Sequence, residues 1–169
     1  MNTQLPLTVC AFGVLLVSAC STSNDHKPAP VYGASATTSA ASAATNATGP
    51  AHVMTAQNSL GTILTDGAGR ALYLFAADTG STSTCTGDCA TEWPPLTTNG
   101  APVAGAGADP ALLSTTARPD GTTQLTYHGH PLYYYDDDKG PGTAEGQGEY
   151  KYGAKWYVLD PAGNEVERS

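Results

Sequence analysis

Positive charge is scarce in this sequence, and that scarcity excludes several functions. Lysine and arginine together number 7 against 15 aspartates and glutamates, which gives a formal net charge of -8 over 169 residues. Binding to nucleic acid or to anionic lipid headgroups needs clustered basic side chains, and the sequence has no such cluster. We therefore expect no nucleic-acid partner and no electrostatic docking to a membrane surface.

Long amphipathic patterns are missing as well. Short apolar stretches alternate with turn signals, and the chain carries 19 glycines and 12 prolines. Frequent turn-forming residues of this kind favour short strands over long helices. The predicted strands are residues 53–57, 62–65, 71–76, 122–127, 131–135 and 155–159. One helical turn is expected at 89–93, capped by Asp88, and a second at 109–113.

These elements predict an all-β, mostly antiparallel domain that follows a signal peptide and a disordered linker. The domain would occupy residues 52–169 and contain two similar multi-strand repeats, at about 60–96 and 120–160. The pattern does not decide between a sandwich, a barrel and an open sheet.

The first apolar stretch, residues 5–17, has the length of a signal-peptide core and is too short for a membrane span. It ends in Val17-Ser18-Ala19-Cys20, which resembles the lipobox of bacterial lipoproteins, although residues 1–9 lack the usual basic residue. The resemblance implies that residues 1–19 are removed and that Cys20 carries a covalent lipid. The protein would then be anchored on the extracytoplasmic face of the cell membrane or outer membrane.

The segment 20–51 is rich in alanine, serine and threonine and shows no apolar periodicity. Such a composition buries too little apolar surface to offset its ordering entropy. We expect it to be a disordered tether between the lipidated cysteine and the domain.

An internal repeat is the most specific feature of the domain. Residues 69–78 align with residues 129–138 as Gly-x-x-Leu-Tyr-x-aromatic-x-x-Asp, and a tryptophan follows each copy. The repeated positions are Leu72, Tyr73, Phe75 and Asp78, then Leu132, Tyr133, Tyr135 and Asp138. Strand alternation places the leucines on one face and the motif aromatics on the other, which predicts burial on both sides. The alternative is that the tyrosines line a groove for a small or carbohydrate-like ligand.

With this motif the sequence resembles the bacterial secreted-repeat lipoproteins of unknown function. Residues 85–96 and 120–133 share the same likeness. The resemblance implies an envelope location and a small β-rich fold, and it implies no particular biochemical activity.

Two cysteines of the domain, Cys85 and Cys89, would lie in an oxidising compartment, where a disulfide is expected. The alternative is a copper site formed by these two thiolates with His128 or His130. The acidic residues Asp136, Asp137, Asp138, Glu145 and Glu149 do not follow the spacing of a calcium-binding loop, so a solvated loop is expected there.

No nucleophile motif and no phosphate-binding glycine loop is present. We therefore expect a non-catalytic binding or structural module of the cell envelope, with no cofactor apart from the lipid and with a protein or small-molecule partner. The alternative is a copper-handling protein. A third class, an enzyme or an electron-transfer accessory, would use the tyrosine-rich surface.

Overall fold

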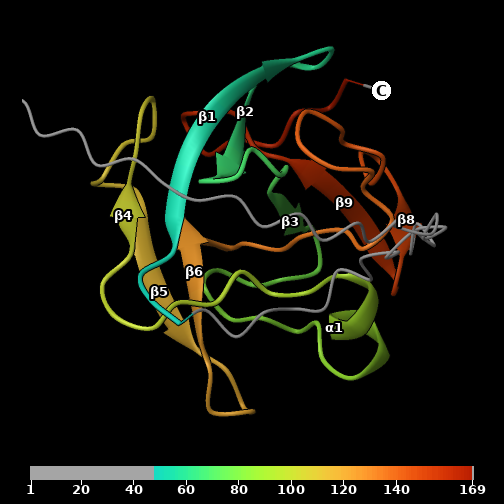
Figure 1. The fold of residues 1–169 in the computed structure, drawn as a ribbon. Helices are drawn as coiled ribbons and strands as arrows, with labels where there is room; N and C mark the ends of the chain where they lie inside the picture. Colours follow the sequence, from blue (N-terminus) through green and yellow to red (C-terminus); the bar gives the residue numbers. More distant parts are fainter. Residues whose placement is uncertain (1–47, 169) are drawn as a thin grey trace, which may run out of the picture. The chain divides into compact units, whose positions relative to one another are not determined.

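Nine short strands and a single helical turn form the part of the chain that the computed structural model describes, residues 48–168 (Figure 1). The predicted signal peptide, Cys20 and most of the predicted tether lie outside these residues. The elements in chain order are β1 (His52–Asn58), β2 (Gly61–Asp66), β3 (Tyr73–Phe75), α1 (Asp88–Glu92), β4 (Val103–Ala104), β5 (Leu113–Ala117), β6 (Thr123–Tyr127), β7 (His130–Pro131), β8 (Tyr150–Lys151) and β9 (Ala154–Val158).

The strands form three small sheets, in the orders β2-β1-β4, β3-β9-β8 and β5-β6-β7. Every strand pair is antiparallel except β1 with β4. The predicted all-β, mostly antiparallel fold class is therefore confirmed, and the domain is made of several small sheets instead of one continuous sheet.

Each copy of the motif follows an antiparallel hairpin. The β1–β2 hairpin precedes the first copy, and the β5–β6 hairpin precedes the second. The copies do not pack as two separate halves, because β3 of the first repeat pairs with β9 at the end of the second. Tyr133 of the second copy likewise forms isolated β-bridges with two residues of the first repeat, Pro95 and Tyr73.

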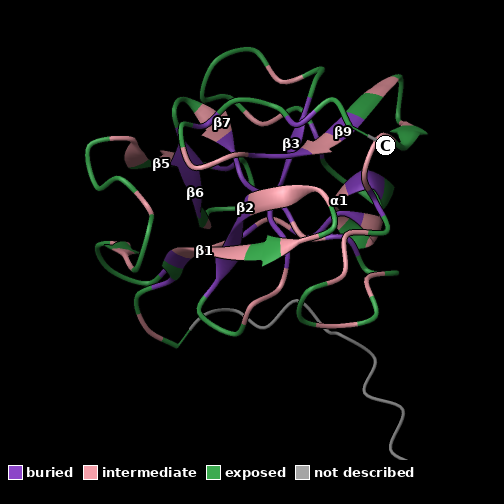
Figure 2. Ribbon diagram, turned by 90° about the horizontal axis from the view of Figure 1, so that it is seen from above, coloured by how far each residue is buried: buried purple, intermediate pink, exposed green. Residues whose placement is uncertain are grey.

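The motif segments separate two hydrophobic cores. One core is largely aromatic and contains Tyr73, Phe75, Tyr133 and Tyr135 together with both tryptophans. The other is largely aliphatic and includes the motif residues Leu72 and Leu132 and the adjacent Leu74. Figure 2 shows the buried strands in the interior, surrounded by exposed loops. Burial on both faces of the motif strand agrees with the prediction from its alternating pattern.

Some local predictions differ from the structure. Helix α1 has Gly87 at its N-cap position and no side-chain cap, so Asp88 is its first residue instead of its cap. Residues 110–112 form a hydrogen-bonded turn and no helix. Strands β4, β5 and β8 were not expected from the sequence, because their side chains are mostly half-buried or exposed and lack a regular apolar alternation.

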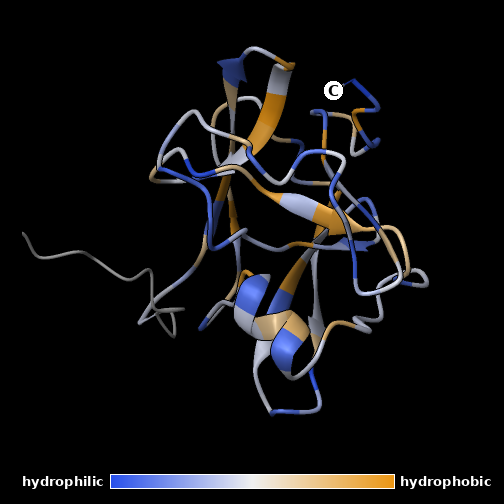
Figure 3. Ribbon diagram, turned by 90° about the vertical axis from the view of Figure 1, so that its right-hand side faces the viewer, coloured by the Kyte–Doolittle hydropathy of each residue, from blue (hydrophilic) through white to orange (hydrophobic). Residues whose placement is uncertain are grey.

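The residue before β1 is already held by the domain. Ala51 is buried, and its N–H donates to the Thr98 hydroxyl at 3.0 Å. Figure 3 shows hydrophobic residues in short stretches of the strands, with hydrophilic residues along the outer loops. No helix within residues 48–168 has the length and apolar composition that a membrane span requires.

Candidate functional site

Two crossed hydrogen bonds join the copies of the repeated motif. The Tyr73 hydroxyl of the first copy donates to the Asp138 carboxylate of the second, at 3.1 Å to Oδ1 and 3.0 Å to Oδ2. The Tyr133 hydroxyl of the second copy donates to Oδ2 of Asp78 in the first, at 2.6 Å. Each copy thus supplies the acceptor for the tyrosine of the other.

The two motif aspartates also hold the loops that follow them. Oδ1 of Asp78 accepts both the N–H and the hydroxyl of Thr84 at 2.7 Å. Oδ1 of Asp138 accepts the N–H of Glu145 at 2.8 Å. Burial raises the pKa of Asp138, and the hydrogen bonds from Glu145 and Tyr73 oppose that rise. The carboxylates therefore organise the turns after each strand, as short polar side chains commonly do.

Four aromatic rings form a continuous stack across the boundary between the repeats. Phe75 stacks on Trp156 with ring centroids 4.2 Å apart and planes 12° apart. Trp156 stacks on Trp93 at 3.9 Å and 8°, and Trp93 stacks on Tyr135 at 4.2 Å and 23°. Each motif aromatic therefore packs against the tryptophan that belongs to the other repeat.

The motif tyrosines close this stack from the sides. Tyr73 lies edge-on to Trp93 at 5.4 Å between centroids, and Tyr133 lies edge-on to Trp156 at 5.2 Å. Edge-to-face contacts of this kind are favourable for aromatic rings. Gly146 covers Trp93, and a Cβ atom at this position would lie 2.6 Å from the indole ring. A residue with a side chain at position 146 would therefore displace the stack.

Both crossed tyrosines are neutral phenols in the folded protein. Burial raises the pKa of Tyr73 well above its ordinary value of 10.0, and the neighbouring Asp138 adds to the rise. Burial and the charge of Asp78 have the same effect on the pKa of Tyr133. A phenol that keeps its proton acts as a hydrogen-bond donor to the carboxylate and is poorly suited to act as a base.

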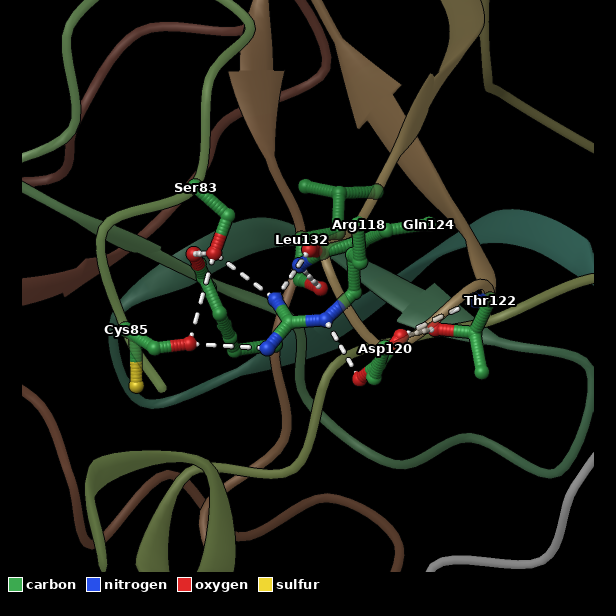
Figure 4. A network of polar contacts seen from close by, with 8 residues as sticks. Ser83, Cys85, Arg118, Asp120, Thr122, Gln124 and Leu132 are labelled. Atoms are coloured by element: carbon green, nitrogen blue, oxygen red, sulfur yellow. Dashed lines mark hydrogen bonds and ion pairs between the residues drawn. The ribbon is translucent and has the colours of Figure 1, made fainter. Parts of the chain in front are cut away.

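A buried arginine extends the Tyr133–Asp78 pair into a wider polar network. Figure 4 shows the contacts of Arg118 in this network. The Tyr133 hydroxyl lies 2.7 Å from Oγ of Ser83, and Nη1 of Arg118 donates to the same oxygen at 2.7 Å. Arg118 also donates to Oε1 of Gln124 at 2.7 Å and to the carbonyl oxygen of Cys85 at 2.8 Å.

The guanidinium of Arg118 is almost fully buried, whereas its ion-pair partner Asp120 lies at the surface, 3.3 Å from Nε. Neutral oxygens therefore satisfy most of this buried charge. Gln124 has no exposed surface, and it extends the network by donating a hydrogen bond from Nε2 to the carbonyl of Leu132 at 2.8 Å. The network connects the β5–β6 hairpin to the cysteine loop and fixes their relative positions.

Cys85 and Cys89 form a disulfide, with Cα atoms 5.3 Å apart. The expected pairing is thus confirmed, and both residues are buried in the aromatic core. The bridge encloses the start of α1, which Figure 1 places on the same side of the domain as β8 and β9. Contacts from Lys151 and Tyr152 to Glu92 join these two regions.

The candidate copper ligands do not come together as a site. The sulfur atoms of Cys85 and Cys89 are bonded to each other, and the rings of His128 and His130 lie edge-on with centroids 6.4 Å apart. Among residues 48–168 no group of three or more histidine, cysteine, aspartate or glutamate side chains has the geometry to hold a metal ion. The geometry therefore gives the copper hypothesis no support.

The aspartates at the end of the second motif copy each have a different environment. Asp138 accepts hydrogen bonds from Tyr73 and Glu145, as described above, and Asp137 accepts a hydrogen bond from the Tyr135 hydroxyl at 3.2 Å. Burial, then the charges of Asp137 and Glu92, raise the pKa of Asp136. Within the described part of the chain these carboxylates form no group of three or more that could hold a metal ion.

Comparison with known families bears directly on the repeat. A family profile described as "Secreted repeat of unknown function" matches residues 54–97 and matches again at residues 114–160. The chain belongs to this family. The resemblance to the secreted-repeat family is thus confirmed, and each matched segment covers most of one hairpin, one motif copy and one tryptophan. Comparison with curated proteins and with solved structures gave no match.

Sequence reasoning missed the polar network around Arg118. Arg118, Gln124 and Ser83 lie outside the repeated motif, and nothing in their local sequence distinguishes them from surface residues. One weak signal exists, because Arg118 is one of only 7 lysine and arginine residues in the chain. The crossed pairing was also beyond sequence reasoning, since an alignment of two copies does not reveal which copy supplies each partner.

Proposed function

We propose that this secreted repeat is a non-catalytic binding or structural module of the bacterial cell envelope, anchored to a membrane through a lipid on Cys20. The observation that carries the proposal is the use of the motif itself. The hydroxyls of Tyr73 and Tyr133 donate to the motif aspartates of the opposite copy, and the aromatic rings stack across the repeat boundary. Because these polar groups are already paired with each other, the main role of the motif is to stabilise the folded domain.

The chemistry of the motif supports this role over catalysis. General acid–base catalysis needs a group whose pKa is matched to its task and which can reach a substrate. The two crossed tyrosines have strongly raised pKa values, caused first by burial, and no exposed surface. Their protons are held within the domain.

The proposed anchor rests on the lipobox-like sequence ending at Cys20 and on the secreted character of the family. A chain of about 30 residues with the composition of segment 20–51 would have an average reach of about 30 Å. In the proposed arrangement the lipid holds the protein at the membrane, and this segment gives the domain access to partners near the surface.

The anchor is tested by expressing the full chain in a bacterium with radiolabelled palmitate. Wild-type protein is expected to carry label and to partition into the detergent phase. Cys20→Ser is expected to abolish both properties, while Cys10→Ser, which changes a cysteine within the predicted signal peptide, leaves both intact. Unlabelled wild-type protein in the aqueous phase would refute the lipid anchor.

A second experiment distinguishes the proposed module from a copper-handling protein. Free thiols and bound copper are counted in the purified full chain, first as isolated and then after reduction in the presence of copper. We expect no free thiol before reduction and no stoichiometric copper afterwards. One copper per chain, lost in Cys85→Ser and in Cys89→Ser, would replace this proposal with copper handling.

A further inference from the structure

The four-ring stack has the geometry of a path for electrons. Its three consecutive contacts have centroid distances of 4.2, 3.9 and 4.2 Å, and no two neighbouring planes differ by more than 23°. Face-to-face rings at such distances overlap their π systems directly, and electronic coupling falls steeply with separation. A hydrophobic core can be filled without this alignment, since edge-to-face pairs pack equally well.

Trp93, near the centre of the stack, has an unusual environment. Its Nε1–H is buried and has no hydrogen-bond partner among the described residues, whereas Nε1–H of Trp156 donates to the carbonyl of Lys151 at 3.3 Å. Buried donors are normally paired. An indole that loses an electron becomes a far stronger acid than the neutral indole and normally releases its Nε1 proton to a neighbouring base. Because no described residue is placed to accept this proton, oxidised Trp93 keeps it, and its positive charge stays mobile along the stack.

Tyr135 lies at one end of the stack, and its hydroxyl has a hydrogen-bond acceptor, which the Nε1–H of Trp93 lacks. Its hydroxyl donates to Oδ2 of Asp137 at 3.2 Å, and it borders the surface with 9% exposure, whereas Tyr73 and Tyr133 have none. Burial first, and then Asp137, raise the pKa of Tyr135 against the opposing effect of Lys151. The residue is therefore a protonated phenol with a carboxylate ready to accept its proton.

We propose that the stack is a redox relay, in which a one-electron oxidant removes an electron from the Trp93–Trp156 pair and Tyr135 restores that electron. The oxidant is reduced by one electron, and the tryptophan pair becomes a radical cation. Tyr135 then gives one electron to the pair and its phenol proton to Asp137, leaving a neutral tyrosyl radical beside a protonated carboxyl. A soluble one-electron reductant such as ascorbate returns the electron at the surface, and the proton returns from Asp137.

Tyr135 is favoured over the other tyrosines as the exit point for two reasons. It stacks face-on to Trp93, while Tyr73 and Tyr133 meet the tryptophans edge-on at 5.4 and 5.2 Å. It also borders solvent, where a small reductant can reach it. The relay would carry oxidising equivalents out of the core that contains the disulfide, and it does not depend on the proposed lipid anchor.

The test uses the full chain in detergent micelles and a ruthenium(III) polypyridyl complex, generated by a light flash, as the one-electron oxidant. Transient absorption and electron paramagnetic resonance distinguish tryptophan radical cations from tyrosyl radicals. In the wild type a tryptophan radical is expected to decay as a tyrosyl radical appears. Tyr135→Phe, which keeps the stacked ring, is expected to lose the tyrosyl signal and to prolong the tryptophan radical. Asp137→Asn is expected to slow the appearance of the tyrosyl signal.

Three further variants and a spectroscopic check make the outcome decisive. Tyr150→Phe removes an exposed tyrosine outside the stack and is expected to behave as the wild type. Trp93→Phe is expected to suppress the Tyr135 radical, because it removes the oxidisable link. Circular dichroism from the coupled indoles checks that the stack is intact in the Tyr135 and Asp137 variants. A wild-type tyrosyl yield in Tyr135→Phe or in Trp93→Phe would overturn the relay, as would loss of the signal in Tyr73→Phe with the stack intact.

Discussion

Tyr73 and Tyr133, which occupy the same position in the two motif copies, hydrogen bond to each other in both directions through their main chains. The N–H of Tyr73 donates to the carbonyl of Tyr133 at 2.9 Å, and the N–H of Tyr133 donates to the carbonyl of Tyr73 at 2.9 Å. The two copies are therefore related by an approximate twofold axis that passes between these residues. Around this axis each tyrosine hydroxyl reaches the aspartate of the other copy. The two crossed hydrogen bonds therefore hold the same two copies together.

Removing one hydroxyl of a crossed pair is expected to destabilise the domain. Tyr133→Phe leaves Asp78 without its closest donor, and the expected loss in free energy of unfolding is about 1–3 kcal/mol. A double-mutant cycle with Asp78→Asn, measured by urea unfolding, is expected to show that the two changes are not additive. Tyr150→Phe, at an exposed position, is the matched control and is expected to change stability by less than about 0.5 kcal/mol.

The buried guanidinium is expected to tolerate no replacement. Arg118→Ala would remove the closest donor from the carbonyl oxygen of Cys85 and from Oε1 of Gln124, at a cost of about 2–4 kcal/mol. Arg118→Lys is expected to recover little, because an ammonium cannot reach these separated acceptors as the planar fork does. Arg70→Lys, at a half-exposed ion pair, is the comparison. A small effect of Arg118→Ala in thermal unfolding would contradict the role assigned to this network.

Alkaline solution is expected to weaken the domain. The pKa values of Tyr73, Tyr133 and Tyr134 lie above the ordinary 10.0, in each case with burial as the largest cause. The unfolded chain releases these protons near pH 10, while the folded chain retains them and so binds more protons in that range. Stability is therefore fully present below about pH 10 and is lost as pH rises through the folded pKa values. Urea midpoints at pH 8 to 11 in steps of about one unit, with Tyr134→Phe flattening the decline, would check this expectation.

The disulfide is expected to contribute modestly through chain entropy. It joins residues separated by 4 positions, and closing so short a loop corresponds to about 2 kcal/mol. The double variant Cys85→Ser, Cys89→Ser is expected to lose this amount and to remain folded, as judged by urea unfolding. A much larger loss would mean that the contact between Arg118 and the Cys85 carbonyl depends on the bridge.

The sequence predicted the local structure of this domain better than its long-range pairings. Alternating residues around Tyr73 and Phe75 correctly indicated a strand buried on both faces, and Cys85 with Cys89 correctly indicated a disulfide. Strand β5 escaped prediction, because Leu113–Ala117 is mostly half-buried or exposed and takes its structure from pairing with β6. The network around Arg118 depends on tertiary contacts that no local pattern encodes.

The exchange of strands between the repeats has a consequence for secretion. β3 lies near the start of the domain, and its pairing partner β9 lies near the end. A chain that crosses a membrane N-terminus first cannot assemble its aromatic core until Ala154–Val158 has emerged. Folding is thereby delayed until translocation is nearly complete, and a protein truncated before β9 would be secreted with its first repeat exposed to proteases.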